Sequence, residues 1–247
     1  MEAINFSNVS IAYGKTEILK DFSLSVKQGE FITVIGNSGS GKTTALKLIN
    51  GLLKCTSGCV AVFGRDVGKM TPKEIIKFRR NIGYVIQGIG LFPHMTVLKN
   101  LTYVLDLEGN NKKNSIIRAR ELIKLVDMDE EYLYRYPREL SGGQRQRVGI
   151  ARALAADPQI LLMDEPFGAV DEITRKGLQT AIAEIHKKLK KTIFFITHDI
   201  DEALLLGDRV LVLHDGAIHQ YDTPEELIKN PATDFVLSLL GHRYSNK

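Results

Sequence analysis

The sequence has no tryptophan and few cysteines or prolines, with two and seven respectively among its 247 residues. Cys55 and Cys59 are too few to form a disulfide framework, and their spacing without nearby histidines does not suit a metal site. We therefore interpret both as ordinary thiols of a reducing cytoplasm.

Long apolar runs and a strong excess of one charge are also absent. No stretch approaches the roughly 18 apolar residues that can cross a bilayer. Residues 1–5 lack the basic and apolar regions of a signal peptide. The net charge is only +4, and the basic cluster 187–191 is typical of a solvated helix end. We expect no nucleic-acid partner, and a peripheral subunit if the protein works at a membrane.

The clearest motif is a loop that comprises Gly36, Asn37, Ser38, Gly39, Ser40, Gly41, Lys42 and Thr43. An apolar, β-branched stretch precedes it, and helix-forming residues follow from Thr44. This order is the context of a phosphate-binding loop, whose backbone N–H groups and helix dipole attract phosphate. Lys42 can reach the β- and γ-phosphates, and Thr43 places a hydroxyl where Mg²⁺ would lie. Because a glycine-rich turn with a stray lysine would not explain both flanks, we predict a nucleoside triphosphate site.

Strands and helices alternate along most of the chain, which predicts an α/β fold. The stretches 3–13 and 17–26, on either side of Gly14 and Lys15, predict an antiparallel β layer. Further strands are predicted at 57–64, 82–86, 159–163, 192–197, 209–213 and 217–220, and helices at 72–80, 172–189, 224–229 and 232–240. We interpret the apolar stripe of helix 172–189 as core packing; it comprises Ile173, Leu178, Ile182, Ile185 and Leu189.

Residues 96–157 are instead predominantly helical in pattern, with helices predicted at 97–107, 115–126 and 144–156. We predict one domain over residues 1–247. Residues 1–87 and 158–247 would form a catalytic core with the β layer, and about 88–157 an inserted helical subdomain. The entry segment 89–95 is apolar but rich in helix breakers. It is either a buried hinge or an exposed surface on which a partner docks, and we favour docking.

Polar residues end several predicted strands, and ligands of open α/β sheets bind at the carboxyl ends of the strands. Gln87 either contacts Mg²⁺ or the attacking water, or is an ordinary surface residue. Asp164 can hold Mg²⁺ through water, and Glu165 can polarise a water aimed at the γ-phosphate. His198 is either structural or a donor to the γ-phosphate. Tyr13 either packs against the protein or stacks on a nucleotide base.

The motif Leu-Ser-Gly-Gly-Gln at 140–144 directly precedes a predicted helix. Ser141, Gly142 and Gly143 either cap that helix or bind a second phosphate through a hydroxyl and free N–H groups. Since one phosphate loop is already present, the simplest reason for another is that two subunits share their nucleotides. Asp171 ends a turn and is expected to cap the helix that follows.

Together these motifs resemble those of the ATP-binding cassette (ABC) ATPases, over nearly the full chain. The phosphate loop is similar to their Walker A motif, 160–164 to Walker B, and 140–144 to the signature that defines the family. Gln87 matches the Q-loop, Asp171 the D-loop and His198 the switch histidine. The resemblance implies a phosphate-loop NTPase (RecA-like) core with an N-terminal antiparallel β layer and an inserted α-helical signature subdomain.

The resemblance also implies a head-to-tail homodimer that encloses two ATP molecules. For ATP it implies that Tyr13 stacks on adenine and that the loop 36–43, with Thr44, binds the phosphates. It also implies a set of residues that contact the nucleotide of the partner subunit: Ser141, Gly142, Gly143, Gln144 and Asp171. Around Mg²⁺ it implies Thr43, Gln87 and Asp164. In catalysis it implies Glu165 as the base, with Gln87 and His198 beside the reacting phosphate.

Segments 82–87, 90–96 and 164–168, with 173–175, are similar to the ATPases of osmoprotectant uptake systems, which carry glycine betaine, carnitine, choline or proline. Gly88 departs from that group, in which a second glutamine is common. The resemblance implies an ATP-hydrolysing importer subunit, peripheral on the cytoplasmic face of the cell membrane. Its partners would be integral-membrane permease subunits, a second ATPase subunit and, indirectly, a substrate-binding protein. The alternatives are an importer of amino acids or another small solute, a stand-alone exporter ATPase, and a non-transport ABC ATPase.

Overall fold

The computed structural model describes residues 1–14, 16–168 and 170–241. The chain forms two compact units, one of residues 1–78 with 191–247 and one of residues 79–190. Lys15, in the turn predicted between the first two strands, lies outside the described residues.

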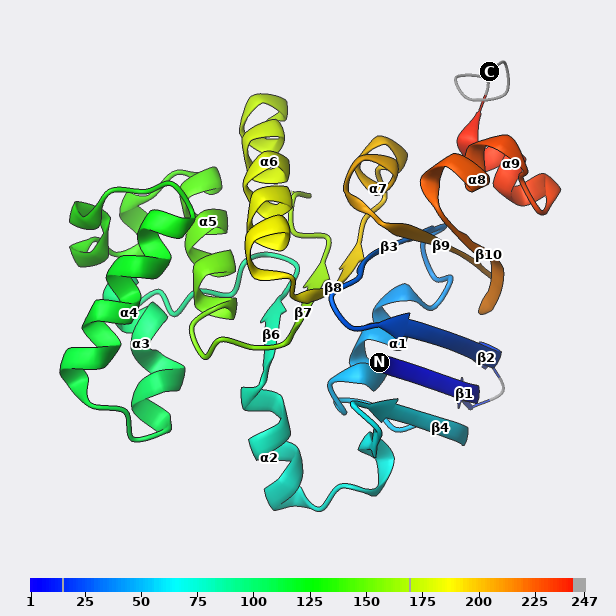
Figure 1. The fold of residues 1–247 in the computed structure, drawn as a ribbon, viewed down its shortest axis with the longest axis horizontal. Coiled ribbons are helices and arrows are strands. Elements are labelled where there is room, and N and C mark those ends of the chain that lie inside the picture. Colours follow the sequence, from blue (N-terminus) through cyan, green and yellow to red (C-terminus); the bar gives the residue numbers. More distant parts are fainter. Residues whose placement is uncertain (15, 169, 242–247) are drawn as a thin grey trace. The chain divides into compact units, whose positions relative to one another are not determined.

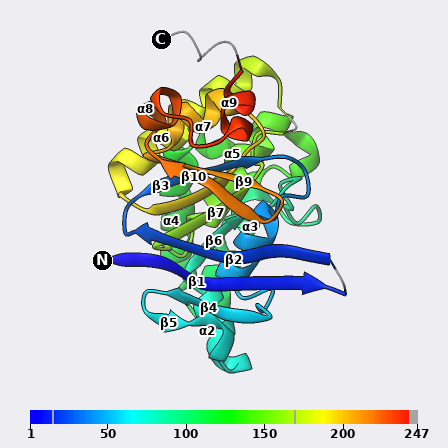
Figure 2. The ribbon, with the colours of Figure 1, turned by 90° about the vertical axis from the view of Figure 1, so that its right-hand side faces the viewer.

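Four strands of the first unit form a sheet in the order β2, β1, β4, β5 (Figure 2). They are β1 (Glu2–Tyr13), β2 (Thr16–Lys27), β4 (Ser57–Val62) and β5 (Arg65–Asp66), and each pair is antiparallel. Along β2, the buried residues Phe22, Leu24 and Val26 alternate with exposed polar residues. The ring of Phe22 meets that of Phe6 edge to face, with centroids 4.9 Å apart. The predicted N-terminal antiparallel layer is confirmed.

Four further strands of the first unit follow the order β10, β9, β3, β8. They are β3 (Phe31–Gly36), β8 (Thr192–Ile196), β9 (Arg209–His214) and β10 (Ala217–Asp222). Strand β3 runs parallel to both β8 and β9, whereas β10 is antiparallel to β9. Every residue of β3 and β8 is buried, as in parallel sheets covered on both faces. This explains why both strands are almost continuous apolar runs in the sequence.

Helices follow the parallel strands of the first unit: α1 (Lys42–Ile49) comes after β3, and α7 (Ile200–Leu206) after β8. Helix α2 (Pro72–Arg80), preceded by the 3₁₀ turn Val67–Lys69, leads into the second unit. Helix α7 is not among the helices predicted from the sequence. The sequence signal for it is the N-cap at Asp199, whose carboxylate accepts from the N–H of Glu202.

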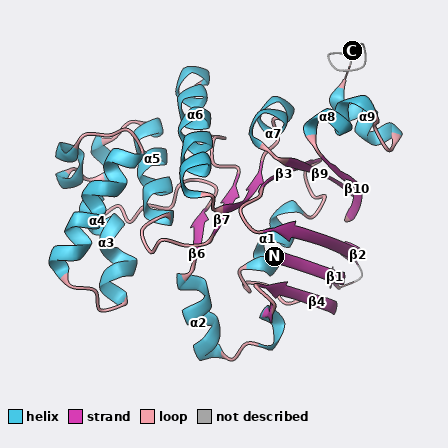
Figure 3. Cartoon of the chain, in the orientation of Figure 1, coloured by secondary structure: helices cyan, strands magenta, loops and turns pink. Residues whose placement is uncertain are grey.

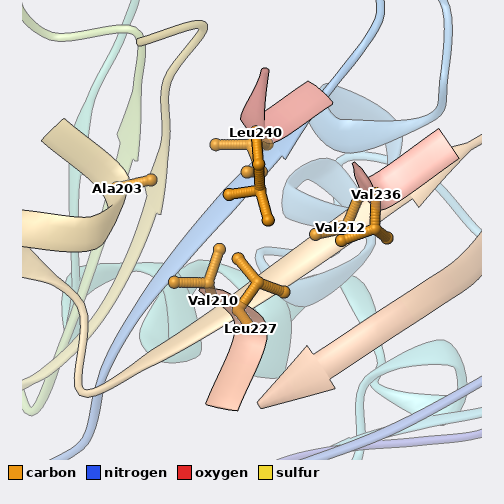
Figure 4. Packing of buried hydrophobic residues seen from close by; sticks show 7 residues of the cluster. Ala203, Val210, Val212, Leu227, Val236 and Leu240 are labelled. Carbon is orange, nitrogen blue, oxygen red and sulfur yellow. The ribbon is translucent and has the colours of Figure 1, made fainter. Parts of the chain in front are cut away.

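One apolar cluster joins β3, α7 and β9 to the last two helices, α8 (Pro224–Lys229) and α9 (Asp234–Leu240) (Figure 4). Its buried members are Ile35, Ala203, Val210, Val212, Leu227, Val236 and Leu240. Removal of such side chains from water is the main favourable contribution to folding. The cluster therefore fixes α8 and α9 to the sheet of the first unit.

The second unit contains the parallel strands β6 (Ile82–Val85) and β7 (Ile160–Asp164) and is rich in helix (Figure 3). Its helices are α3 (Val97–Leu107), α4 (Lys112–Leu125), α5 (Gly142–Ala153) and α6 (Glu172–Leu189). Helices α3, α4 and α5 pack on one another (Figure 1), and the 3₁₀ turns η2 (Glu130–Tyr134) and η3 (Pro137–Glu139) connect α4 to α5. No helix in the described part of the chain combines the length and apolarity that a membrane span needs.

The interpretation of the α6 stripe as core packing is only partly correct. Leu178, Ile182 and Ile185 are buried, whereas Ile173, in the first turn, is 86 % exposed. A periodic pattern identifies which face of a helix is apolar. It does not show how far along the helix the neighbouring elements extend, and they do not cover Ile173.

We predict that Leu227→Ala destabilises the protein by about 3 kcal/mol, because Leu227 is completely buried and its truncation leaves a cavity. Leu237→Ala, on the neighbouring helix α9, is the matched control, since Leu237 is 45 % exposed. Its cost should stay below about 1 kcal/mol. Urea denaturation of both variants measures the difference, and equal midpoints would contradict the central place of Leu227 in the cluster.

Candidate functional site

The loop between β3 and α1 requires glycine at two positions for steric reasons. Gly36 has φ +148°, and a Cβ there would lie 1.9 Å from the carbonyl oxygen of Leu213. Gly41 has φ +98°, and a Cβ there would lie 2.5 Å from Leu19 Cδ2. Any other residue would both strain the backbone and collide with β9 or β2. The glycines thus let the loop fold closely against its own unit.

The ammonium group of Lys42 lies inside this loop. Lys42 is only 5 % exposed, and its Nζ donates to the carbonyl oxygens of Gly36 and Asn37, each at 2.8 Å. These contacts hold a positive charge where the loop turns. A cation fixed in this way is well placed to bind a phosphate chain as a point charge.

Two further features of the loop fit a phosphate ligand. Ser40 Oγ is buried and has no hydrogen-bond partner among the described residues. A buried hydroxyl without a partner is costly, and a phosphate oxygen would accept a hydrogen bond from it. The N-cap of α1 is Gly41, which makes no side-chain cap, so the first-turn N–H groups have no capping side chain. Thr43 and Thr44 lie in this first turn.

His198 follows β8 on a backbone that is fixed on both sides. The hydroxyl of Thr197 donates to the buried carboxylate of Glu202 at 2.6 Å and accepts from the N–H of Asp199 at 3.0 Å. The carboxylate of Asp199 in turn accepts from the N–H of Glu202, which caps α7. The His198 side chain itself is exposed. The network therefore positions an accessible imidazole at the end of a buried strand.

Tyr13 lies at the end of β1 and is 54 % exposed. This exposure excludes packing of Tyr13 in the core but not packing at the edge of the sheet. A half-exposed ring at a strand end can also stack on a base. That role stays a prediction.

In the second unit, acidic residues follow β7. Asp164 is the last residue of the strand and is 6 % exposed, and Glu165 follows with φ +47°. The Gln87 side-chain amide donates from Nε2 to Glu165 Oε2 at 2.9 Å. Burial and, secondarily, the charge of Asp164 raise the pKa of Tyr84 to about 12, so Tyr84 stays a neutral phenol. The structure thus brings together Gln87 and Glu165, two residues that the sequence identifies separately.

The signature residues form a capping box at the start of α5. Ser141 Oγ accepts from the N–H of Gln144 at 3.2 Å, and Gln144 Oε1 accepts from the N–H of Ser141 at 2.9 Å. Ser141 is exposed. A hydroxyl that accepts one hydrogen bond still has its proton to donate, so capping and anion binding by Ser141 are compatible.

At Gly143 the signature packs closely against the start of α6. A Cβ on Gly143 would lie 2.2 Å from Thr174 Cγ2. Thr174 is in turn held by Asp171, whose carboxylate accepts from the Thr174 N–H at 3.0 Å and caps α6. This hydrogen bond lowers the pKa of Asp171. Thr174 is not a sequence candidate, because nothing in the pattern shows that two helix starts meet.

The segment after Gln87 is conformationally unusual. Gly88, Ile89 and Gly90 all have positive φ, at +82°, +72° and +59°. For a β-branched residue such as Ile89 this conformation is an outlier. The guanidinium of Arg152, on α5, holds the segment by donating to the carbonyl oxygens of Gly90 at 2.7 Å and Ile89 at 3.1 Å.

The same segment borders a groove within the second unit. Its lining includes Arg79, Arg80, Phe92, Tyr103, Leu107 and Arg152. Tyr103 and Leu107 are 37 % and 57 % exposed. The groove therefore combines exposed apolar side chains with arginines, in the region from which the sequence predicts docking.

The described residues contain no group of three or more His, Cys, Asp or Glu side chains that could hold a metal ion. This observation excludes an all-protein cage within the described ranges and still fits Mg²⁺. Mg²⁺ keeps several waters and binds through one or two carboxylates together with substrate phosphates. A strand-end carboxylate such as that of Asp164 supplies an oxygen ligand of the kind that this role needs.

Comparison with known proteins agrees with this geometry. A family model described as ABC transporter matches residues 19–168. The dimeric post-hydrolysis structure of the ATP-binding cassette MJ0796 with ADP and Pi superposes with a TM-score of 0.81 at 34 % identity, and covers 90 % of this chain and 98 % of that one. The fold is that of a phosphate-loop NTPase cassette. The chain belongs to the ABC transporter family.

Curated relatives are similar over almost the whole chain. The glycine betaine/carnitine/choline transport ATP-binding protein OpuCA of Bacillus subtilis is 49 % identical over 96 % of this chain and 62 % of the relative. The carnitine transport ATP-binding protein OpuCA of Listeria monocytogenes is 48 % identical over 96 % of this chain and 59 % of the relative. The glycine betaine uptake system ATP-binding protein YehX of Escherichia coli is 44 % identical over 96 % of this chain and 76 % of the relative. The chain thus spans about three fifths of the length of the two OpuCA proteins.

We predict that Gly143→Ala lowers the melting temperature by about 2–4 °C, because the new methyl group overlaps Thr174 Cγ2. Higher helix propensity of alanine offsets only about 1 kcal/mol of this cost. Thr174→Ser removes the methyl group, so the double variant should recover the loss. Differential scanning calorimetry of the three variants tests this, and a double variant no more stable than Gly143→Ala would contradict the contact.

Proposed function

We propose that this protein is the ATP-hydrolysing subunit of an ABC importer for small quaternary amines or related osmoprotectants. The observation that carries the enzymatic part is the Gln87–Glu165 hydrogen bond next to the buried Asp164. A carboxylate that accepts a hydrogen bond from a neutral amide keeps its orientation. It can therefore accept a proton from a water or orient that water towards a phosphate.

In this proposal ATP binds through Lys42, the loop N–H groups, Thr43 and Thr44, with adenine on Tyr13. Thr43, Gln87 and Asp164 are the residues that would hold Mg²⁺, which would neutralise phosphate charge when bound. Glu165 acts as the base, and His198 donates to the γ-phosphate. Buried Lys42 and the partnerless Ser40 hydroxyl support the phosphate part of the proposal.

The proposed working unit is a head-to-tail homodimer in which Ser141, Gly142, Gly143, Gln144 and Asp171 complete the site of the other subunit. The solvent-accessible hydroxyl of Ser141, with its proton free to donate, supports this role. Two first-turn N–H groups of α5, those of Gly142 and Gly143, add donors to an anion. We further propose that residues 88–157 act as the helical subdomain that presents them.

The proposed permease surface is the groove bordered by Phe92, Tyr103 and Leu107. The protein would bind the permease there from the cytoplasmic face of the cell membrane. Exposed apolar side chains next to arginines are typical of protein interfaces. Gln87 lies just ahead of the segment that borders the groove, and Arg152 links that segment to α5. A permease bound there would act on the segment that follows Gln87.

The cargo class rests on the relatives. Those reported above are named for glycine betaine, carnitine and choline. These three solutes share a positively charged, trimethylated nitrogen. A substrate-binding protein and the permease, rather than this chain, would contact them.

We predict that Glu165→Gln binds ATP but hydrolyses it at least about a hundredfold more slowly, because positioning survives while proton transfer fails. A coupled phosphate-release assay and nucleotide binding measured on the same preparation test this. Gln87→Ala, which removes the donor to Glu165, should give a smaller loss of rate. Turnover of Glu165→Gln within twofold of the unmodified protein would remove Glu165 from the proposed role.

We also predict that Glu165→Gln, tagged and purified with ATP from gently solubilised native membranes, carries a multi-span permease with it.

Cells without the gene should lose uptake of radiolabelled glycine betaine, carnitine or choline at high osmolarity and recover it with the unmodified gene. Loss of amino-acid uptake instead would point to the importer alternative with another cargo. Recovery of the protein without any membrane partner would contradict the transport function itself.

A further inference from the structure

Gln144 makes a contact beyond the capping box, and it reaches a residue outside the signature. While its Oε1 accepts from Ser141, its Nε2 donates to the phenolic oxygen of Tyr132 at 3.1 Å. One side chain therefore connects the start of α5 to the 3₁₀ turn η2, twelve residues earlier. The hydrogen bond is partly buried, where such bonds are less weakened by water.

The ring of Tyr132 contacts Arg135, and the turn that carries it is anchored to its surroundings. The guanidinium of Arg135 lies 4.4 Å from the centroid of its ring, and Arg135 pairs with Glu131 at 2.7 Å. The carbonyl oxygen of Arg135 accepts from the N–H of Val97, which anchors η2 to α3. The adjacent Leu133 is 1 % exposed. The Tyr132 ring is thus partly buried beneath Arg135, on a turn that is fixed to α3.

The geometry points to Tyr132 as a positioning residue of the signature, which holds Gln144 in the capping box that presents the Ser141 hydroxyl and the N–H groups of Gly142 and Gly143. The inference rests on the proposed role of these three residues at the nucleotide of a second subunit. A Gln side chain has several rotamers of similar energy, and the Tyr132 hydroxyl selects the one in which Oε1 faces the Ser141 N–H. Without the Tyr132 hydroxyl, the Gln144 side chain is no longer held in the rotamer that closes the capping box.

Tyr132→Phe tests this, because it removes only the hydroxyl and leaves the ring beneath Arg135. Tyr134→Phe is the matched control, since Tyr134 lies on the same 3₁₀ turn and is 66 % exposed. Both are made in the full chain carrying Glu165→Gln, so that ATP is not consumed. Analytical ultracentrifugation with ATP and Mg²⁺ gives the dimer Kd, and a fluorescent ATP analogue at low protein concentration gives nucleotide affinity of the monomer.

We predict that Tyr132→Phe raises the ATP-dependent dimer Kd about tenfold, because each of the two signatures must then be ordered when the dimer forms. Nucleotide affinity of the monomer should match that of Tyr134→Phe. In a Gln144→Ala background, Tyr132→Phe should change the dimer Kd by less than about twofold, because the partner is already absent. An equal dimer Kd for Tyr132→Phe and Tyr134→Phe, or a full effect that persists without Gln144, would overturn the inference.

A spectroscopic readout separates this inference from the proposed function. In a ¹⁵N-labelled monomer, Tyr132→Phe should shift the side-chain amide resonances of Gln144, whereas Tyr134→Phe should not. If Glu165→Gln alone fails to dimerise with ATP, the shared site is wrong, and this shift still decides whether Tyr132 orients Gln144. Unchanged Gln144 resonances would overturn the positioning role.

Discussion

Burial of parallel strands is the constraint on which the rest of this protein depends. Strand β3 is buried along its whole length, so only the residues at its carboxyl end can meet a ligand. The phosphate loop begins there, and His198 follows β8 in the same unit. In the second unit, Gln87 and Glu165 follow β6 and β7 in the same manner. Each unit therefore exposes its polar chemistry where a strand stops.

Helix starts in this protein divide into two kinds. Most are closed by their own side chains, as by Thr96 on α3, Asn111 on α4, Asp171 on α6, Asp199 on α7, Thr223 on α8 and Thr233 on α9. Helix α1 begins with a glycine that makes no side-chain cap. Helix α5 is capped by Ser141, whose side chain is exposed. One proposed anion site is thus a helix start with glycine as its N-cap, and the other is a start capped by an exposed serine.

Unfavourable backbone conformations occur next to this chemistry. Glu165 has φ +47° directly after a buried strand, and Ile89 has φ +72° two residues after Gln87. Such conformations persist only where the surroundings hold them. Arg152 does so for Ile89 through backbone carbonyl oxygens, and the amide of Gln87 contacts the Glu165 carboxylate. Strained backbone thus occurs in the segment 88–90, which lies between Gln87 and the residues that line the groove.

The sequence alone determined the alternation of strands and helices, the phosphate loop and the signature, because each depends on local spacing and on residue types with one dominant physical use. It could not show that Gly143 must be glycine to admit Thr174, that Tyr132 supports Gln144, or that Ile173 is exposed. The sequence likewise left open whether Tyr13 is a packed or an accessible ring. These properties depend on which elements meet in space, and only the tertiary structure decides that, because contacts between distant residues leave no periodic trace in the chain.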